Sequence, residues 1–433
     1  MINLLKAIFV GIVFSIYYFP FELVALPGLN TKMVLAVFGA VCFVWNRIKN
    51  GRKLTMDSGF VWIYCWALLF SLVSFASVAY NTTDDYAYAT YIVSMIVWLS
   101  GAYAIVSLIR AVHGSAGMRL IFHYMAWVCA VQSVLGIMID NIPSLQMFVD
   151  SVVSQNVEYL HKTHRLYGIG AYFDTAGIRF SCALLGLGWL LTHGVSSMWR
   201  KWYWLLFAVI VILGSVMSRT TVVGLGLSLV YMLIQRFRDS DTALVDDMKK
   251  VMPVVVSLAV LAIVVYSAYS AMPGFRRYFE YGFEGFINFF ETGDWSTSST
   301  DRLQSMVVFP DNAKTWLIGD GWFDDPLGRG FYMFTDVGYL RFIFYCGLMG
   351  LSMFIIFFMT CTWTLMKRYR SDRMLFVLMF ILVLAVWVKI STDIFLVYAL
   401  LLLLDVEDNV VTESIFDEIG DDTESDTLLL AER

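Results

Sequence analysis

The chain has 433 residues, of which 59% are hydrophobic and 15% are charged. Such an excess of apolar residues is too large for a single water-covered core, so the composition excludes a soluble globular protein and indicates one that resides in lipid. The formal net charge of −5 is unevenly spread, because residues 405–433 carry eleven acidic residues and one arginine while the rest of the chain is basic.

Apolar segments of membrane-spanning length recur along the chain. At roughly 20 residues per span, we predict an all-α polytopic membrane protein with about twelve transmembrane helices. The predicted helices cover residues 4–26, 31–46, 59–79, 87–109, 118–139, 176–195, 202–217, 220–235, 251–271, 336–366, 374–389 and 392–405. The first has no small-residue cleavage site, so we expect a retained helix and not a cleaved signal peptide. The six cysteines all lie in apolar segments without paired spacing, which supports neither a disulfide framework nor a zinc site.

Lysine and arginine gather in alternate connecting loops, and this bias predicts the orientation of the helices. The basic loops contain Arg47, Lys49, Arg52 and Lys53; Arg110 and Arg119; Arg200 and Lys201; Arg236, Arg238, Lys249 and Lys250; and Lys367, Arg368, Arg370 and Arg373. We expect these loops and both termini in the cytoplasm. The predicted organisation is helices one to nine within 1–271 with an outer loop at 140–175, a large outer loop at 272–335, helices ten to twelve within 336–405 and an acidic cytoplasmic tail at 406–433.

Four phenylalanines recur at helical spacing in the large outer loop, at Phe279, Phe283, Phe286 and Phe290. Such a stripe is typical of an amphipathic helix. Two placements remain open, one in the outer membrane interface with the rings in the acyl chains and one packed on the helix bundle. Elsewhere, no inverted pairing of Pro/Gly-broken segments indicates a transporter.

Cations on the predicted outer side, against the positive-inside rule, are the main functional signal. Arg219 lies in a very short connection, Arg179 follows the start of a helix, and Arg341 lies roughly 7 Å along a helix from Asp336. An ionisable group at membrane depth is costly and is a site hypothesis. The alternatives are snorkelling to lipid phosphates for Arg219 and a neighbouring carboxylate for Arg341. Because the arginine fork suits phosphate oxygens, the residues favour an anionic ligand with a lipid tail, such as a lipid diphosphate.

Displacement at the carbon that carries such a diphosphate requires a base for the incoming hydroxyl. Candidate bases on the outer side are Asp336, His161, His164, Glu158 and Asp174. Asp336 could equally cap the tenth helix, and the two histidines could belong to a solvated loop. A turn that contains Asp320, Asp324 and Asp325 matches no calcium loop, so we interpret it as a solvated turn and not a metal site. The cytoplasmic segments contain no phosphate-cradling loop, which argues against an ATP-driven pump.

Four motifs in this order resemble the O-antigen polymerases and O-antigen ligases of bacterial envelopes: "SRTTVVGLG" from Ser218, "TDRLQSM" from Thr300, "LIGDGWF" from Leu317 and "TDVGYLRFIFYCGLMGL" from Thr335. The resemblance implies an inner-membrane glycosyltransferase with a GT-C-like fold and a periplasmic active site. It implies undecaprenyl-diphosphate-linked oligosaccharide, the lipid bilayer and a chain-length regulator protein as partners. Metal, cofactor and nucleic acid are not expected.

The resemblance also assigns roles to residues. Arg219 and Arg302 match the two arginines that the family places at the donor diphosphate, and Asp336 completes the predicted catalytic set. The predicted substrate-binding set is Arg165, Arg179, Arg341, His161, His164 and Tyr339. Ligases of the family carry a histidine just before the "YL" of the last motif; this chain does not, which favours a polymerase. The polymerases' arginine–glycine loop spacing is not matched either, since the distance from Arg165 to Gly177 is one residue too long.

The sequence thus predicts a polymerase that joins lipid-linked repeats. Two alternatives remain open, a ligase that transfers the glycan to a different acceptor and a flippase of lipid-linked oligosaccharide. A flippase should place charges along a path open to both sides, whereas here the buried cations gather on the predicted outer side.

Overall fold

The computed structural model describes residues 2–50, 58–155, 157–163, 165–194, 196–238 and 273–405. The predicted helix at 251–271, His164 and the acidic tail at 406–433 lie outside the described residues. The chain divides into two compact units, each built from separate stretches. The first unit comprises Met1–Thr31, Leu108–Trp295 and Leu404–Arg433, and the second comprises Lys32–Ser107 and Ser296–Leu403.

Within the described residues, seven helical segments are long and apolar enough to cross a membrane. They are α2 (Thr31–Asn50), α3 (Ser58–Asn81), α4 (Tyr91–His113), α5 (Met118–Asn141), α8 (Phe173–Thr192), the continuous segment Ser197–Met217 and α17 (Gly338–Arg368). Shorter apolar helices occur at Leu4–Tyr18, within α1 (Ile2–Tyr18), and in α18 (Arg373–Val386). The chain is therefore a mostly helical, multi-pass membrane protein, as predicted.

Two predicted spans are shorter in the structure. The helix expected over 4–26 ends at Tyr18, and the chain continues as β1 (Glu22–Leu23) and β2 (Leu26–Asn30), which pair with β3 (Val153–Ser154) in the order β2-β1-β3. Pro20 explains the end of α1, because proline cannot donate the helix hydrogen bond. In place of the helix expected over 392–405, α19 covers only Phe395–Leu402.

The first unit is centred on α5, α8 and α11 (Thr221–Arg238). Small residues let α8 and α11 approach closely, since a Cβ on Gly224 would lie 2.2 Å from the Cα of Ser181. The segment Ser197–Met217 consists of α9 (Ser197–Val209), one π-helical turn η1 (Ile210–Gly214) and α10 (Ser215–Met217). Between α5 and α8 the chain adds the short helices α6 (Pro143–Val152) and α7 (Val157–Thr163).

The predicted phenylalanine-striped helix is two helices, α13 (Pro273–Gly282) and α14 (Glu284–Thr292). The chain leaves helical geometry at Phe283, whose ring stacks on Phe279 with centroids 4.5 Å apart. Gly282 packs directly against the backbone of Ser215 in α10. Of the two placements left open by the sequence, this contact favours packing on the helix bundle for α13, while Phe290 near the end of α14 is 84% exposed.

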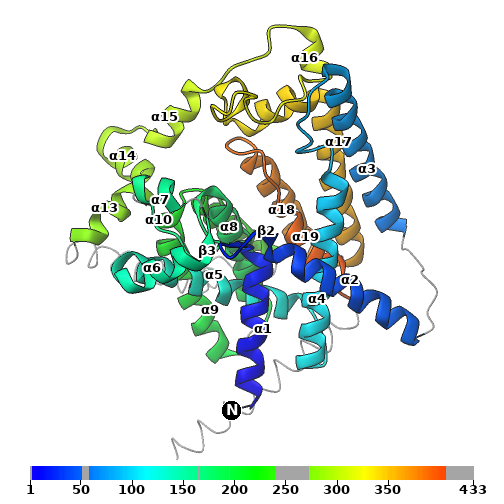
Figure 1. The fold of residues 1–433 in the computed structure, drawn as a ribbon. Helices are drawn as coiled ribbons and strands as arrows, with labels where there is room; N and C mark the ends of the chain where they lie inside the picture. Colours follow the sequence, from blue (N-terminus) through cyan, green and yellow to red (C-terminus); the bar gives the residue numbers. More distant parts are fainter. Residues whose placement is uncertain are drawn as a thin grey trace, which may run out of the picture. The chain divides into compact units, whose positions relative to one another are not determined.

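In the second unit, α17 runs beside α3 and also packs against α18, α19 and α16 (Ala313–Leu317) (Figure 1). Aromatic rings fill the space between these helices. The ring of Phe354 stacks on Phe70 at 4.3 Å and on Trp387 at 5.1 Å between centroids. This unit also contains α2, most of α4, α15 (Ser298–Ser305) and the short 3-10 helix η2 (Tyr332–Phe334), and the last two precede α17.

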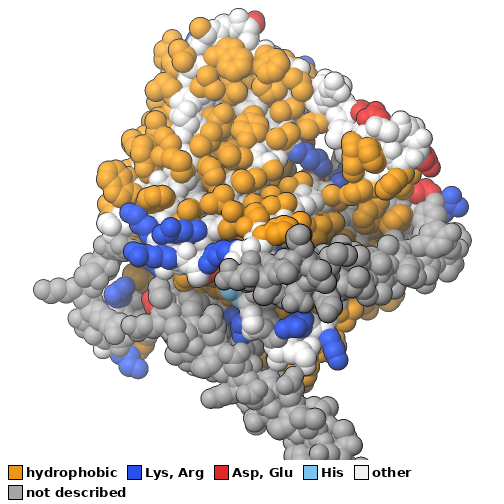
Figure 2. Space-filling model, turned by 180° about the vertical axis from the view of Figure 1, so that it is seen from behind, with side chains coloured by type: hydrophobic (Ala, Val, Ile, Leu, Met, Phe, Trp, Pro, Cys, Tyr) orange, Lys and Arg blue, Asp and Glu red, His pale blue; other side chains and the backbone are white. Residues whose placement is uncertain are grey.

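Large hydrophobic side chains are exposed on the outside of the long helices. On α3, for example, Trp62 is 59% exposed and Phe75 is 52% exposed. Figure 2 shows such side chains covering a broad face, with lysine and arginine gathered in a band beneath it. An apolar face of this extent bordered by cations is typical of a surface that contacts lipid chains and headgroups.

Candidate functional site

In the first unit, the turn between α10 and α11 places Arg219. The backbone N–H of Thr221 donates to the carbonyl of Ser218, which closes the turn within three residues. The carboxylate of Asp174, near the start of α8, accepts hydrogen bonds from the hydroxyls of Ser218 at 3.3 Å and Thr220 at 2.9 Å. The serine and threonines of the "SRTT" motif therefore fix the turn, and Asp174, one of the predicted bases, has this structural task.

Arg219 is held by protein groups on three sides. Its Nε donates to the carbonyl of Tyr281 at 2.6 Å, its guanidinium lies 4.0 Å from the centroid of the Tyr281 ring, and it forms an ion pair with Glu284. Only 11% of the Arg219 side chain is exposed. These contacts anchor Arg219 to α13 and α14. Its partners are therefore protein groups and not the lipid phosphates of the snorkelling alternative.

A second guanidinium shares the same aromatic ring. Arg165 lies 5.4 Å from the ring centroids of both Tyr281 and Phe173. The guanidiniums of Arg165 and Arg219 therefore both lie against the ring of Tyr281. Unlike Arg219, Arg165 forms no ion pair with a carboxylate of the described residues.

Arg179, on α8, is also held by an aromatic ring. Its guanidinium lies 5.4 Å from the ring centroid of Phe19, and among the described residues it has no carboxylate partner. The first unit thus contains three of the predicted arginines, each against an aromatic face. A guanidinium that lies over an aromatic face is stabilised by the ring, and its N–H groups point from the edge of its plane, so for Arg165 and Arg179 this contact leaves room for an anion.

His161, a predicted substrate-binding residue and candidate base, belongs to a hydrogen-bonded network in α6 and α7. Its Nε2 lies 3.2 Å from a carboxylate oxygen of Asp150 and 3.1 Å from the hydroxyl of Tyr167. The Tyr167 hydroxyl donates to the other carboxylate oxygen of Asp150 at 2.8 Å, and burial raises the pKa of Tyr167 above its usual range. A histidine oriented by a carboxylate is an arrangement suited to proton transfer.

In the second unit, Arg341 is enclosed near the start of α17. Its guanidinium lies between two rings, 3.7 Å from the centroid of Phe323 and 4.2 Å from that of Phe331. Its Nη2 donates at 3.1 Å to both the carbonyl of Phe323 and the carboxylate of Asp324, and its Nη1 donates to Asp336 at 3.5 Å. The neighbouring carboxylate that the sequence left as an alternative is therefore present, and Arg341 acts as a clamp between the loop and α17.

Asp336 does not cap α17. The N-cap residue is Val337, whose own side chain makes no capping hydrogen bond. Asp336 instead faces Arg341, and 31% of its side chain is exposed. The cap alternative for Asp336 is thus wrong, because the helix begins two residues later, whereas its role as a base stays a prediction.

The Gly-Asp-Gly turn at residues 319–321 is docked into a break in α17. Gly347 leaves helical geometry with φ 67° and ψ −175°. The carbonyl groups before the break accept hydrogen bonds from the turn. The backbone N–H of Asp320 donates to the carbonyl of Phe344 at 2.5 Å, and that of Gly321 donates to the carbonyl of Tyr345 at 3.1 Å. Within a membrane helix such a break is tolerated only where protein groups satisfy the freed backbone. The "LIGDGWF" motif supplies these groups.

Residues from α3 and the following loop hold the turn from the other side. The side chain of Asn81 donates to the carbonyl of Gly319 at 3.1 Å, and the Thr83 hydroxyl donates to that of Gly321 at 2.8 Å. The carboxylate of Asp85 accepts the N–H of Phe323 at 2.7 Å. The sequence does not predict this support, for which its one signal is the cluster of Asn, Thr and Asp that follows the apolar run of α3.

Each carboxylate of the acidic turn has its own cation. Asp320 accepts from Lys314 at 2.8 Å, Asp324 pairs with Arg341, and Asp325 pairs with Arg329 at 2.5 Å. Arg329 lowers the pKa of Asp325 through this hydrogen bond. Across the described part of the chain, no group of three His, Cys, Asp or Glu side chains is placed to hold a metal ion. The turn is therefore an ion-paired structural element.

Arg302 and Tyr339 are placed differently from each other. Arg302 lies in α15, which begins with a capping box between Thr297 and Thr300, and its exposed side chain has no ion pair among the described residues. Tyr339 is tied to α18, since its hydroxyl donates to the carbonyl of Leu384 at 2.8 Å and its N–H donates to that of Trp387 at 2.9 Å. Arg302 is thus available to a ligand, whereas the Tyr339 hydroxyl already has an acceptor.

The structure groups the predicted site residues within each unit. Arg165 and Arg219 share one ring in the first unit, and Asp336 and Arg341 form a pair in the second. Comparison of the chain with protein-family models, with curated proteins and with solved structures gives no match. A function for the chain must therefore be argued from these residues.

Proposed function

We propose that this chain is an inner-membrane glycosyltransferase that polymerises undecaprenyl-diphosphate-linked oligosaccharide repeats into O-antigen or a related surface polysaccharide. The observation that carries the proposal is the arginine pair on Tyr281, where Arg165 and Arg219 present two guanidiniums beside one aromatic ring. Such a pair suits the two phosphates of a lipid diphosphate, because each planar fork donates two hydrogen bonds to neighbouring oxygens.

The proposed topology includes more spans than the seven membrane-length segments and adds an orientation in the membrane. It has about twelve transmembrane helices, both termini in the cytoplasm, a GT-C-like fold and a periplasmic active site. The support for it is the alternation of basic loops along the sequence. It assigns Arg165, Arg219, Arg302 and Asp336 to the periplasmic side.

In the proposed reaction, a hydroxyl of one repeat attacks the anomeric carbon of a second, lipid-linked glycan. The new glycosidic C–O bond forms as the bond from the anomeric carbon to the diphosphate oxygen breaks, and undecaprenyl diphosphate leaves. Arginine donors stabilise the negative charge that grows on the leaving phosphate. The hydroxyl proton passes to a base, for which Asp336 and the Asp150-oriented His161 are the two candidates.

Glu284 is the carboxylate that an incoming anion must compete with at Arg219. It forms an ion pair with this arginine, whose side chain is only 11% exposed. A diphosphate carries more negative charge than one carboxylate and therefore competes for the guanidinium. We expect donor binding to weaken the Arg219–Glu284 pair and to recruit Arg165, which lacks a carboxylate among the described residues.

Reconstitution with lipid-linked repeats in the presence of a chelator tests this function. The proposal expects longer lipid-linked glycans from the wild type and a loss of about 100-fold or more in rate for Arg219→Ala and Arg302→Ala. Arg276→Ala is the matched control, because Arg276 is an exposed arginine of α13 that forms an ion pair with Glu280 one helical turn away. Normal polymer ladders from both site variants would refute the assignment.

The same assay separates the alternatives. Transfer of the glycan to a different acceptor without chain growth would indicate a ligase. Movement of unmodified repeats across the bilayer would indicate a flippase.

A further inference from the structure

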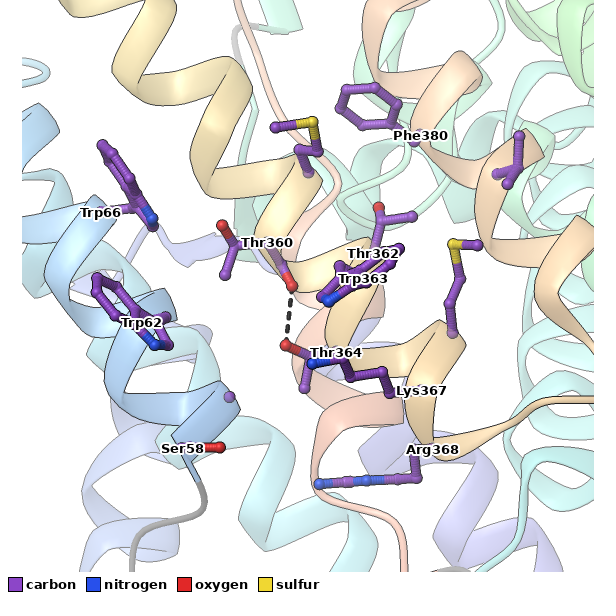
Figure 3. Close-up of a pocket in the computed structure, with 14 residues that line it drawn as sticks. Ser58, Trp62, Trp66, Thr360, Thr362, Trp363, Thr364, Lys367, Arg368 and Phe380 are labelled. Carbon is purple, nitrogen blue, oxygen red and sulfur yellow. Dashed lines mark hydrogen bonds between the residues drawn. The ribbon is translucent and has the colours of Figure 1, made fainter.

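A groove of about 950 Å³ lies in the second unit between α3, α17 and α18 (Figure 3). Three tryptophans and a phenylalanine form much of its wall, with Trp62 and Trp66 on α3, Trp363 on α17 and Phe380 on α18. Its volume is at the upper end of the range of about 300–1,000 Å³ that is typical of ligand pockets. None of the residues proposed for glycosyl transfer lines it.

The threonine hydroxyls in the wall of the groove are satisfied within the protein. The hydroxyl of Thr364 donates to the carbonyl of Thr360 at 2.8 Å (Figure 3), and that of Thr360 donates to the carbonyl of Ile356 at 2.7 Å. Thr362 shares a hydrogen bond with Tyr398 at 2.9 Å. Apart from the two basic residues, aromatic, methionine and valine side chains make up most of the wall, and its threonine hydroxyls are already engaged, so the groove suits an occupant that is apolar along most of its length.

One end of the groove is cationic. Lys367 and Arg368, in the last turn of α17, are the two charged residues that line it, and no carboxylate does so among the described residues. The Nζ of Lys367 lies 5.4 Å from the ring centroid of Trp363 and has no carboxylate partner in the described part of the chain. Arg368 donates to the carbonyl of Leu402 at 2.6 Å, which fixes its guanidinium at this end. The positive charge at this end favours an occupant with an anionic group.

The length of the groove matches one membrane leaflet. From Met359 to Lys367 the wall follows α17 over eight residues, a rise of about 12 Å at 1.5 Å per residue. One leaflet contributes about 15 Å to the hydrocarbon core. Tryptophan and basic residues at the end of such a span are typical of the level of the headgroups.

We propose that this groove binds one anionic phospholipid, with an acyl chain between α3 and α17 and the headgroup phosphate at Lys367 and Arg368. Basic pockets between membrane helices bind anionic headgroups through such pairs of cations. On the orientation proposed above, this lipid belongs to the cytoplasmic leaflet. The lipid site does not depend on that reaction.

The test measures lipid binding to the purified full-length chain by native mass spectrometry in an uncharged detergent. We expect the first dioleoylphosphatidylglycerol to bind more tightly than dioleoylphosphatidylcholine. Lys367→Gln should weaken phosphatidylglycerol binding about fivefold, the equivalent of about 1 kcal/mol for one basic residue. Lys367→Arg should restore it.

Arg370→Gln is the matched control. Arg370 is exposed and lies three residues beyond Lys367, but it does not line the groove. The Arg370→Gln substitution removes the same charge near the same end of α17 and should leave the affinity for phosphatidylglycerol unchanged. Equal weakening by Lys367→Gln and Arg370→Gln, or equal binding of the two lipids, would overturn the proposal.

Two further measurements locate the lipid in the groove. Phosphatidylglycerol with brominated chains should quench tryptophan fluorescence of the wild type more than that of Trp363→Phe, which removes a ring from the wall. Dibutyryl phosphatidylglycerol, which has the headgroup but not the long chains, should not compete with the dioleoyl lipid. Undiminished quenching in Trp363→Phe, or full competition by the short-chain lipid, would show that the headgroup alone is bound and refute the groove.

Discussion

Replacing Gly319 with alanine tests the docking of the Gly-Asp-Gly turn into the break of α17. Gly319 has φ +86°, and a Cβ there would lie 2.5 Å from the backbone carbon and oxygen of Tyr345. The left-handed conformation alone costs an alanine about 1–2 kcal/mol. The overlap adds about 1–3 kcal/mol, because the obstacle is backbone and not the flexible end of a side chain.

Gly328→Ala separates the two costs. Gly328 has φ +69° but no atom within 4 Å of its Cβ position, so alanine there meets only the conformational cost. With about 2–4 °C of melting temperature per kcal/mol, we expect Gly328→Ala to lower the melting temperature by a few degrees and Gly319→Ala by about twice as much or more. Thermal unfolding in detergent, followed by tryptophan fluorescence, measures both. Equal shifts for the two variants would refute the close docking of the turn.

Three other predictions concern the chemistry and the pH response. Asp336→Asn should reduce the polymerisation rate far more than His161→Ala, and the reverse order in a reconstituted assay would move the base to His161. Tyr281→Leu should weaken donor binding by about 1–2 kcal/mol, whereas Tyr281→Phe, which keeps the ring beneath both guanidiniums, should not; titration with lipid-linked donor compares them. Burial raises the pKa of Tyr332 from 10.0 to about 12, so this phenol stabilises the fold below pH 10 and loses that effect as the pH rises toward 12. Unfolding measured from pH 9 to 12 should therefore depend less on pH in Tyr332→Phe than in the control Tyr86→Phe.

The length of the apolar segments predicted the seven membrane-length segments of the described residues, because lipid imposes one strong requirement on every span. Apolar length predicts the helices less well where the chain satisfies its backbone hydrogen bonds in another way. Residues 22–30 are apolar enough to continue α1, yet Pro20 ends the helix and a hairpin follows. The same limit applies to the phenylalanine stripe, whose helical spacing continues across the break at Phe283.

The sequence located several charged residues of the candidate sites but not their partners. Arg219 and Arg341 were selected because an arginine at the mouth of a membrane helix is costly, and the structure places protein groups around both. Glu284 lies 65 residues from Arg219 along the chain, and no local pattern indicates such a pair. Asp85 is more distant still from the loop that it holds, so only the fold reveals that contact.

The break in α17 changes how variants of the last two motifs must be interpreted. Asp320, Asp324 and Arg341 hold the loop against the helix, and the loop in turn satisfies the carbonyl groups that Gly347 leaves free. A substitution at any of these positions exposes unpaired polar groups at membrane depth and therefore acts on stability before it acts on chemistry. Loss of activity in such variants identifies a catalytic group only when the melting temperature is unchanged. We expect Asp336→Asn to keep the wild-type melting temperature, because Arg341 still donates to Asp324 and to the Phe323 carbonyl when Asp336 is neutralised. An inactive Asp336→Asn protein with a wild-type melting temperature would thus be direct support for its role as the base.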